Sequence, residues 1–444
     1  MNFDRYKKKL TDIYARAIKR ADPEVLVKDA VKLNDGKITI NGLNYKTNKV
    51  KVVGFGKASC TMAAGVESAL PPEMIEGMVV TKYGHLKPLS KIKSMEAGHP
   101  IPDLNSIRAT NHITRLAREA DAEDVVIFLV SGGGSALLET PRQGINLKDI
   151  QKLTDLLLKS GASINEINAL RKHLSGVKGG WLAKTVFPAS YVSLIISDVI
   201  GSDLTSIASG PTVPDTTTFE DCEEILKRYE LYNRVPDSIF NLMQRGIKGE
   251  AEDTPKPGEP FFEKGEHKIV CDNEVICTFL IEEANRAGLN PVYIKTDKTQ
   301  GSVEEFAEFL RTKIKPYTEQ RRKNEIPPTL LIMGGELTVK IPPGATGMGG
   351  RNQHLALLFI RDCIPYFPGI CALFASTDGT DGPTEASGGF SHGGLITTLD
   401  DKFAQLEEAV HNFDSYNFLR QHGELFITGP TGNNLNDVFM IFIP

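Results

Sequence analysis

The residues best able to do chemistry in this 444-residue chain lie in short segments rich in glycine, hydroxyl and charged side chains. Glycine lets the backbone approach an anion closely, and carboxylates are ligands that Mg²⁺ prefers. We therefore predict a site for phosphate groups and magnesium. Each segment comes directly after an apolar run, and the segments are residues 56–57, 131–135, 197–198, 334–336, 376–382 and 428–434.

The segment 131–135 (SGGGS) is the first candidate for contact with phosphate. Gly132, Gly133 and Gly134 would let backbone N–H groups face an anion, and Ser135 would begin the next helix. Such a turn can also need glycine only for its positive φ. No Walker loop is present, and residues 54–59 (GFGKAS) lack the third glycine of a dinucleotide motif. The sequence therefore disfavours nicotinamide chemistry.

Lys57 and Arg351 are the two cations for which the sequence predicts a catalytic role. Lys57 comes directly after an apolar run and would lie at a helix N-terminus, where the helix dipole favours an anion. Arg351 lies in 347–353 (GMGGRNQ), where a guanidinium can hold a carboxylate or a transferring phosphate through two hydrogen bonds. Further candidates for contact with substrate or nucleotide are Arg171, Lys172, Gly335, Asn352 and Gln353.

Four carboxylates complete the candidate site. Asp198 follows the apolar run 191–196 and could accept the proton of a substrate hydroxyl or hold magnesium. Glu336, Asp378 and Asp381 are the candidate metal ligands. The two aspartates could instead shape their glycine-rich loop as Asx turns. No HExxH motif occurs, so the sequence argues against a zinc enzyme.

The elements that position these residues alternate between apolar runs and helical stretches. The runs 52–55, 124–130 and 191–196 predict strands of a parallel sheet buried on both faces. The alternation restarts after a segment rich in glycine, proline and glutamate. We predict the α/β class: two doubly wound α/β domains, a Rossmann-like one over 1–245 and a second over 266–444, joined by a linker over 246–265. Because ligands bind where such strands end, we expect the active site in the cleft between the domains.

Composition limits the kinds of partner and the location that we expect for this protein. The net charge of −5 and the lack of a long basic block exclude a general affinity for nucleic acid. No run of eighteen apolar residues could span a membrane. Six isolated cysteines without a CxxC pair, and an N-terminus unlike a signal peptide, predict reduced thiols and a cytoplasmic location. We expect small-molecule substrates, and the sequence leaves a homodimer open.

Taken together, these segments resemble the class II glycerate kinases, whose C-terminal half is called the MOFRL domain. The resemblance covers most of the chain. Its main departure is His354, where the family usually has glutamate, and a slight one is Asn433, where the family more often has threonine. It implies a glycerate kinase domain over 1–245 and a MOFRL domain over 266–444. The matching segments are 54–58, 97–103, 131–137, 170–180, 197–213, 334–338, 349–353, 377–384 and 428–437.

The resemblance implies transfer of phosphate from ATP, with Mg²⁺, to the 2-hydroxyl of D-glycerate. Lys57 and the loop 132–135 would neutralise charge on substrate and phosphates, and Arg351 would clamp the glycerate carboxylate or the migrating phosphoryl group. Asp198 would orient the hydroxyl, and Asp378 or Glu336 would help to hold magnesium. Some members of the family are labelled hydroxypyruvate reductases, so an NAD(P)H-dependent reductase is the alternative.

Overall fold

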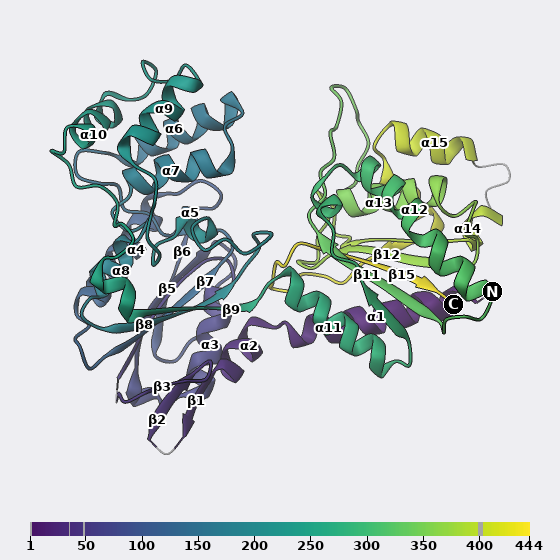
Figure 1. Ribbon diagram of the computed structural model, residues 1–444, viewed down its shortest axis with the longest axis horizontal. Coiled ribbons are helices and arrows are strands. Elements are labelled where there is room, and N and C mark those ends of the chain that lie inside the picture. Colours follow the sequence, from purple (N-terminus) through teal and green to yellow (C-terminus); the bar gives the residue numbers. More distant parts are fainter. Residues whose placement is uncertain (1, 35, 48, 398–402) are drawn as a thin grey trace. The chain divides into compact units, whose positions relative to one another are not determined.

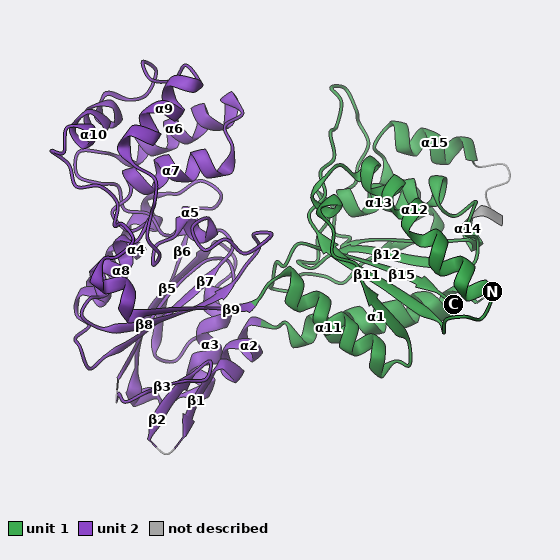
Figure 2. Ribbon diagram, in the orientation of Figure 1, with its two compact units in different colours: residues 1–22, 271–444 green, residues 23–270 purple. Residues whose placement is uncertain are grey.

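The structure is a computed structural model that describes residues 2–34, 36–47, 49–397 and 403–444. The chain forms two compact units: unit 1 comprises residues 1–22 and 271–444, and unit 2 comprises residues 23–270 (Figure 2). Each unit has its own six-stranded sheet with helices packed against it (Figure 1). The predicted class, a two-domain α/β protein, is confirmed.

The boundaries of the units differ from the predicted ranges 1–245, 246–265 and 266–444. Helix α1 (Phe3–Arg20) belongs to unit 1, because its buried face packs on helix α11 (Asn273–Arg286) of the second half. The segment 246–265 folds into unit 2, where Phe261 joins the hydrophobic core. A composition rich in glycine and proline resembled a linker, but it could not reveal this packing.

The sheet of unit 2 has the strand order β6-β5-β4-β7-β8-β9, and its strands β4 to β8 pair in parallel. Strands β4 and β7 are buried along their whole length, which explains their continuous apolar sequences. This is the Rossmann order, in which ligands bind where the direction of winding reverses, here between β4 and β7. The strands are β4 (Val50–Phe55), β5 (Ile75–Lys82), β6 (Ile92–Ala97), β7 (Val125–Ser131), β8 (Ser190–Ile196) and β9 (Gly265–Cys271).

The helices of unit 2 form two groups. One group packs on the sheet and includes α3 (Ser59–Ala69), α4 (Leu104–Arg118) and α8 (Trp181–Val186). The second group encloses a separate core, and comprises α6 (Leu147–Ser160), α7 (Ile164–Leu174), α9 (Phe219–Arg228) and α10 (Asp237–Ile247) (Figure 1). Smaller elements are α2 (Pro23–Ala30), α5 (Gly134–Leu137), β1 (Val31–Asn34), β2 (Lys37–Ile40) and β3 (Leu43–Tyr45).

The sheet of unit 1 is mixed, in contrast to the parallel sheet that the alternation suggested. Its order is β10-β11-β15-β12-β13-β14, and within this sheet, over the residues that the structure describes, only β10 and β11 pair in parallel. The C-terminal strand β15 inserts antiparallel between β11 and β12. The strands are β10 (Asn290–Tyr293), β11 (Thr329–Gly335), β12 (Cys371–Ser376), β13 (Gly388–His392), β14 (Leu425–Phe426) and β15 (Asp437–Ile443).

Helices cover both faces of this sheet (Figure 1). Helices α1 and α11 lie on one face, and α12 (Val303–Arg322) and α13 (Arg351–Asp362) lie on the other. The remaining helices are α14 (Gly394–Thr397), α15 (Phe403–His411) and α16 (Ser415–His422). None of the helices that the structure describes has the length and apolar character needed to cross a bilayer. All six cysteines are unpaired and buried.

Candidate functional site

In unit 2, the loops after β4 and β7 are locked together. The backbone N–H of Lys57 donates to the carbonyl of Gly132 at 2.9 Å, and that of Ala58 donates to Ser131 Oγ at 3.0 Å. Gly56 has φ 127°, and a β-carbon there would lie 2.2 Å from Ser131 Oγ. Only glycine allows this contact, so the sequence at residue 56 fixes the backbone that carries Lys57.

Three polar side chains meet at the glycine loop. A β-carbon on Gly132 would lie 2.0 Å from an Asp198 carboxylate oxygen. A β-carbon on Gly133 would lie 2.8 Å from the His99 ring and 3.3 Å from Lys57 Cε. The structure therefore brings Lys57, Asp198 and the glycines together where the winding of the sheet reverses. His99, which comes after the edge strand β6, is a member of this group that the sequence did not single out as a candidate.

The charges in this loop region favour an anionic ligand. The described residues form no hydrogen bond or ion pair with the Lys57 ammonium group. Burial, with additional effects of Lys57, Lys82 and His85, lowers the pKa of His99 to about 4. The imidazole is therefore neutral at pH 7 and can accept or donate a hydrogen bond. An ammonium group beside partly buried glycine backbone, with no carboxylate paired to it in the described ranges, suits a phosphate or carboxylate.

Ser135 and Arg171 lie near the loop but have other surroundings. Helix α5 is a single turn, shorter than the helix expected after the glycines. Ser135 Oγ shares a hydrogen bond of 2.9 Å with Ser209 Oγ, which donates to Asn168 Oδ1 at 3.1 Å. Burial lowers the pKa of Arg171, with Glu139 acting in the opposite direction. Contact of Ser135 or Arg171 with a ligand stays a prediction.

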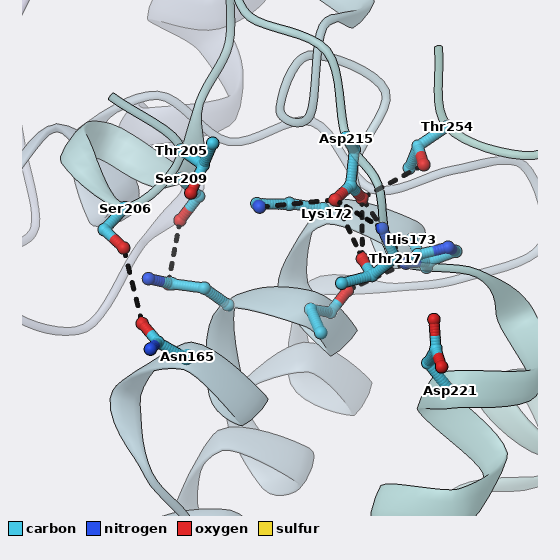
Figure 3. A network of polar contacts seen from close by, with 12 residues as sticks. Asn165, Lys172, His173, Thr205, Ser206, Ser209, Asp215, Thr217, Asp221 and Thr254 are labelled. Carbon is cyan, nitrogen blue, oxygen red and sulfur yellow. Dashed lines mark hydrogen bonds and ion pairs between the residues drawn. The ribbon is translucent and has the colours of Figure 1, made fainter. Parts of the chain in front are cut away.

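Lys172 is part of a buried polar network (Figure 3). Its ammonium group pairs with Asp215 at 3.3 Å, and both side chains are almost fully buried. Asp215 also accepts hydrogen bonds from the hydroxyls of Thr217 and Thr254 (Figure 3). A buried carboxylate needs such a partner, so the charge of Lys172 balances Asp215. The ion pair gives Lys172 a role in the stability of the fold. Its predicted contact with substrate gains no support from these contacts.

In unit 1, Arg351 is the first residue of α13, and two carboxylates hold it. Its Nη1 lies 2.9 Å from Glu336 Oε1, while Nε and Nη2 lie 2.6 Å and 3.3 Å from the two oxygens of Asp437. Although burial opposes it, Asp437 and Glu336 raise the pKa of Arg351, which therefore stays charged. Three of its five N–H groups are used in these contacts, and the others remain for a ligand.

Asp437 is the second residue that the sequence did not single out. It begins β15 and lies opposite Gly335 and Ser376, the last residues of β11 and β12. Asn352 Nδ2 donates to Asp437 Oδ1 at 2.9 Å. Complete burial, only partly offset by Arg351, raises the pKa of Asp437 to about 7. Its carboxylate is therefore placed to orient Arg351 rather than to face solvent.

Asp381 caps the start of α13. It accepts hydrogen bonds from the backbone N–H of Asn352 at 3.2 Å and of Gln353 at 2.8 Å. The Gln353 amide donates to Thr384 Oγ1 at 2.8 Å, and the side chains of Asn352 and Gln353 are fully buried. These contacts join the helix to the loop 376–382. These contacts indicate that Asp381, Asn352 and Gln353 support the helix start that carries Arg351. Their predicted contacts with a ligand stay predictions.

Asp378 fits a magnesium ligand best among the predicted carboxylates. Its Oδ1 accepts hydrogen bonds from Ser376 Oγ and from the Thr380 backbone, both at 2.9 Å. Within the described ranges its Oδ2 has no hydrogen-bond partner, whereas Glu336 is engaged with Arg351. The part of the chain that the structure describes contains no group of three or more potential metal ligands. Mg²⁺ commonly needs only one or two carboxylates beside phosphate oxygens and water, so one such ligand is sufficient.

Gly335 has a structural explanation. A β-carbon there would lie 2.4 Å from Thr299 Cβ, and the next residue, Glu336, donates its N–H to the Thr299 carbonyl at 2.9 Å. Glycine at 335 thus lets the end of β11 approach the segment before α12 closely. This contact sets the direction in which Glu336 leaves the strand.

A pocket of about 460 Å³ opens beside Arg351 within unit 1. Its charged lining residues include Arg351, Asp378 and Asp381. Its apolar lining residues are Val339, Ile341, Pro383 and Phe413, and His354 lines it too. The pocket therefore offers both a charged group for an anion and a surface for an apolar moiety.

The chain thus combines a unit of Rossmann strand order, which has a lysine at its glycine loop, with a second α/β unit in which two carboxylates hold an arginine. A protein-family model described as a domain of unknown function (DUF4147) matches residues 9–244, and the MOFRL family model matches residues 329–437. The chain belongs to the class II glycerate kinase (MOFRL) family. The resemblance predicted from the sequence is confirmed.

Relatives align over nearly the whole chain. A glycerate 2-kinase of Pyrococcus horikoshii is 43% identical, over 97% of this chain and 96% of its own. A D-glycerate 2-kinase of Thermotoga maritima is 38% identical, over 98% and 97%. A putative hydroxypyruvate reductase of Agrobacterium vitis is 36% identical, over 98% and 94%.

Solved structures agree with this assignment. A crystal structure of a Pyrococcus horikoshii protein superimposes with a TM-score of 0.87 at 40% identity, and covers 99% of this chain and 98% of its own. The crystal structure of a glycerate kinase from Thermotoga maritima gives a TM-score of 0.86 at 36% identity, with 99% and 100% covered. The fold of both units is therefore that of glycerate kinases.

Proposed function

We propose that this protein transfers the γ-phosphoryl group of ATP to the 2-hydroxyl of D-glycerate, giving 2-phosphoglycerate and ADP. The observation that carries the proposal is the Lys57 ammonium at the glycine loop, which pairs with no carboxylate of the described ranges and lies where the winding of the sheet reverses. Both substrates carry anionic groups, and such a fold binds anions at this edge of the sheet. The names of two close relatives support phosphorylation at the 2-position.

In this reaction the substrate hydroxyl oxygen attacks the γ-phosphorus while the bond to the leaving ADP oxygen breaks. Asp198 orients the hydroxyl and accepts its proton. Lys57, beside the glycine loop, neutralises phosphate charge, and Arg351 clamps the glycerate carboxylate or the migrating phosphoryl group. Phosphoryl transfer depends mainly on such positioning and charge stabilisation. Mg²⁺, held by Asp378, would supply further positive charge to the phosphates.

The alternative is an NAD(P)H-dependent hydroxypyruvate reductase, which the name of the Agrobacterium vitis relative suggests. The segment 54–59 has serine where the dinucleotide motif needs its third glycine, which argues against it. One pair of assays separates the two: consumption of ATP with D-glycerate, or oxidation of NADH with hydroxypyruvate. We place the reaction in the cytoplasm, a location that the six unpaired cysteines support.

The decisive experiment is a phosphorus NMR spectrum of the product made from D-glycerate and Mg·ATP, which distinguishes the 2-phosphate from the 3-phosphate. Lys57→Ala and Arg351→Ala should each lower kcat at least about a hundredfold, the scale expected when one charge stabiliser is lost. Lys32→Ala and Arg322→Ala, at exposed positions, are the matched controls. Near-normal kcat in both site variants would overturn the proposed roles.

A further inference from the structure

The pocket beside Arg351 is larger than glycerate requires. Its volume of about 460 Å³ falls in the range of roughly 300–1,000 Å³ typical of sites for larger small molecules. Glycerate has three carbons, carries oxygens on each of them, and offers little apolar surface. The apolar side chains that line the pocket, which include Val339, Ile341 and Phe413, therefore suit a second substrate with a larger, flatter part.

Phe413 has an unusual backbone conformation. It lies in the turn that ends α15, where its N–H donates to the Val410 carbonyl at 3.3 Å, and its φ is 56°. Helices commonly end on such a residue, but the residue is usually glycine. A side chain with a β-carbon costs about 1–2 kcal/mol in this conformation. Glu230 and Asn324 end their helices with the same φ of 56° and lie outside the pocket, so it is the position of its ring that distinguishes Phe413.

The surrounding backbone holds this turn in place. A β-carbon on Gly347 would lie 2.3 Å from the Asn412 carbonyl oxygen, so the loop 347–349 packs directly on the turn. The Met348 N–H donates to Asp414 Oδ1 at 3.0 Å, and the Tyr416 N–H donates to the Met348 carbonyl at 2.9 Å. The glycine-rich loop before Arg351 thus fixes the position of Phe413.

The Phe413 ring stacks on His354. The ring centroids are 4.8 Å apart with planes at 13°, and His354 is only 3% exposed. His354 lies one turn after Arg351 on α13, so the stack and the guanidinium lie on one side of the helix and line one pocket. Burial lowers the pKa of His354, so the stack is an uncharged aromatic platform. Nucleobases stack well on such platforms.

We propose that this pocket binds the nucleoside of ATP, with the base against Phe413 and the phosphates toward Arg351. The inference rests on the proposed kinase function and deepens it. Glycerate cannot use the aromatic and apolar lining of the pocket, whereas a nucleotide has groups that match both its apolar and its charged side chains. The competing explanation is that Phe413 only packs on His354 and terminates α15.

The test replaces Phe413 by glycine, which adopts φ 56° without strain and removes the ring. We expect KM for ATP and the Kd for Mg·ADP, measured by calorimetric titration, to rise about tenfold, since stacking of one base is worth about 1–3 kcal/mol. The kcat at saturating ATP and the KM for D-glycerate should change less than about twofold. Phe413→Tyr should keep the wild-type KM for ATP.

Asn324→Gly is the matched control, because Asn324 also has φ 56°, belongs to unit 1 and lies outside the pocket. It should leave both KM values unchanged. If the glycine variant at 413 yields no folded protein, Phe413→Asn provides the same readout, because asparagine also tolerates this conformation. An unchanged KM for ATP, or equal losses for both substrates, would overturn the inference.

The two proposals fail in different ways. If the wild-type protein does not phosphorylate D-glycerate but loss of the ring still weakens Mg·ADP binding tenfold, the proposed function fails and the nucleoside site stands. If the wild-type protein is an active glycerate kinase and Phe413→Gly keeps its affinity for ATP and Mg·ADP, only the nucleoside site is overturned.

Discussion

Replacing Asp437 by asparagine tests whether this buried carboxylate acts through Arg351. The amide keeps the shape of the side chain and one acceptor oxygen, but removes the charge, and with it the ion pair of Asp437 Oδ2 with Arg351 Nε at 2.6 Å or the hydrogen bond from Nη2 to Oδ1 at 3.3 Å. A hydrogen bond to a charged group contributes about 1.5–3 kcal/mol, and about 1.36 kcal/mol corresponds to a tenfold change in rate. We therefore expect kcat to fall about ten- to a hundredfold.

The assay is kcat by coupled ADP release for wild type, Asp437→Asn, Arg351→Ala and the double variant. If Asp437 acts by positioning Arg351, the double variant will be no slower than Arg351→Ala alone. Additive losses would refute the reasoning. Asp362→Asn is the matched control, because Asp362 pairs with Arg361 at the opposite end of the same helix, with bonds of 2.7 Å and 2.8 Å. It should leave kcat unchanged.

The pH dependence gives Asp437 a second readout. Burial raises its pKa from the ordinary value of about 4 to about 7. Between those two pH values the folded protein therefore keeps a proton on Asp437, whereas the unfolded chain has already released it. The stability contributed by the protonated carboxyl is complete below about pH 4 and is lost as pH rises through about 7. Asp437→Asn should remove this slope, together with the rise of kcat as the carboxylate ionises to pair with Arg351.

Close contacts in unit 2 give three further predictions. Gly132→Ala should lower kcat at least about tenfold with little change in melting temperature, because the new β-carbon would lie 2.0 Å from Asp198 and displace its carboxylate. Lys178→Met should cost about 3–5 kcal/mol in urea unfolding, because it leaves the buried Glu139, now 2.6 Å away, without its partner. Although burial opposes it, the buried imidazole of His173, whose Nε2 lies 2.9 Å from Asp253 Oδ1, lowers the pKa of Asp253 to about 2. The stability from that contact is therefore present above about pH 4 and lost as pH falls toward 2, and Asp253→Asn should abolish this dependence.

The sequence could predict the meeting of Lys57, Gly132 and Asp198 because each comes directly after an apolar run. The carboxyl ends of neighbouring parallel strands lie at one edge of a sheet, so the residues just beyond such runs are the ones that meet there. His99 escaped this reasoning because β6 is an edge strand whose sequence, IKSMEA, is not a continuous apolar run. Lys172 could not be interpreted because its partner, Asp215, lies 43 residues away in the sequence.

The sequence did not reveal Asp437 as a candidate for a topological reason. Strand β15 runs antiparallel to its neighbours β11 and β12, so its first residue, rather than its last, lies at the edge that carries Arg351 and Glu336. A search that considers only the residues after each strand therefore looks at the C-terminal end of β15, which lies at the opposite edge of the sheet. Strand direction depends on pairing across more than a hundred residues, which local sequence patterns do not encode.

The assignment of α1 to unit 1 has a consequence for synthesis on the ribosome. The polypeptide leaves unit 1 after residue 22 and returns at residue 271, so unit 2 is contiguous and emerges complete while α1 still awaits its partners. Tyr14, whose hydroxyl donates to the Ser376 carbonyl at 2.7 Å, must wait for more than three hundred further residues. During that interval the apolar side of α1 is uncovered, and the nascent chain depends on early folding of unit 2 to limit aggregation.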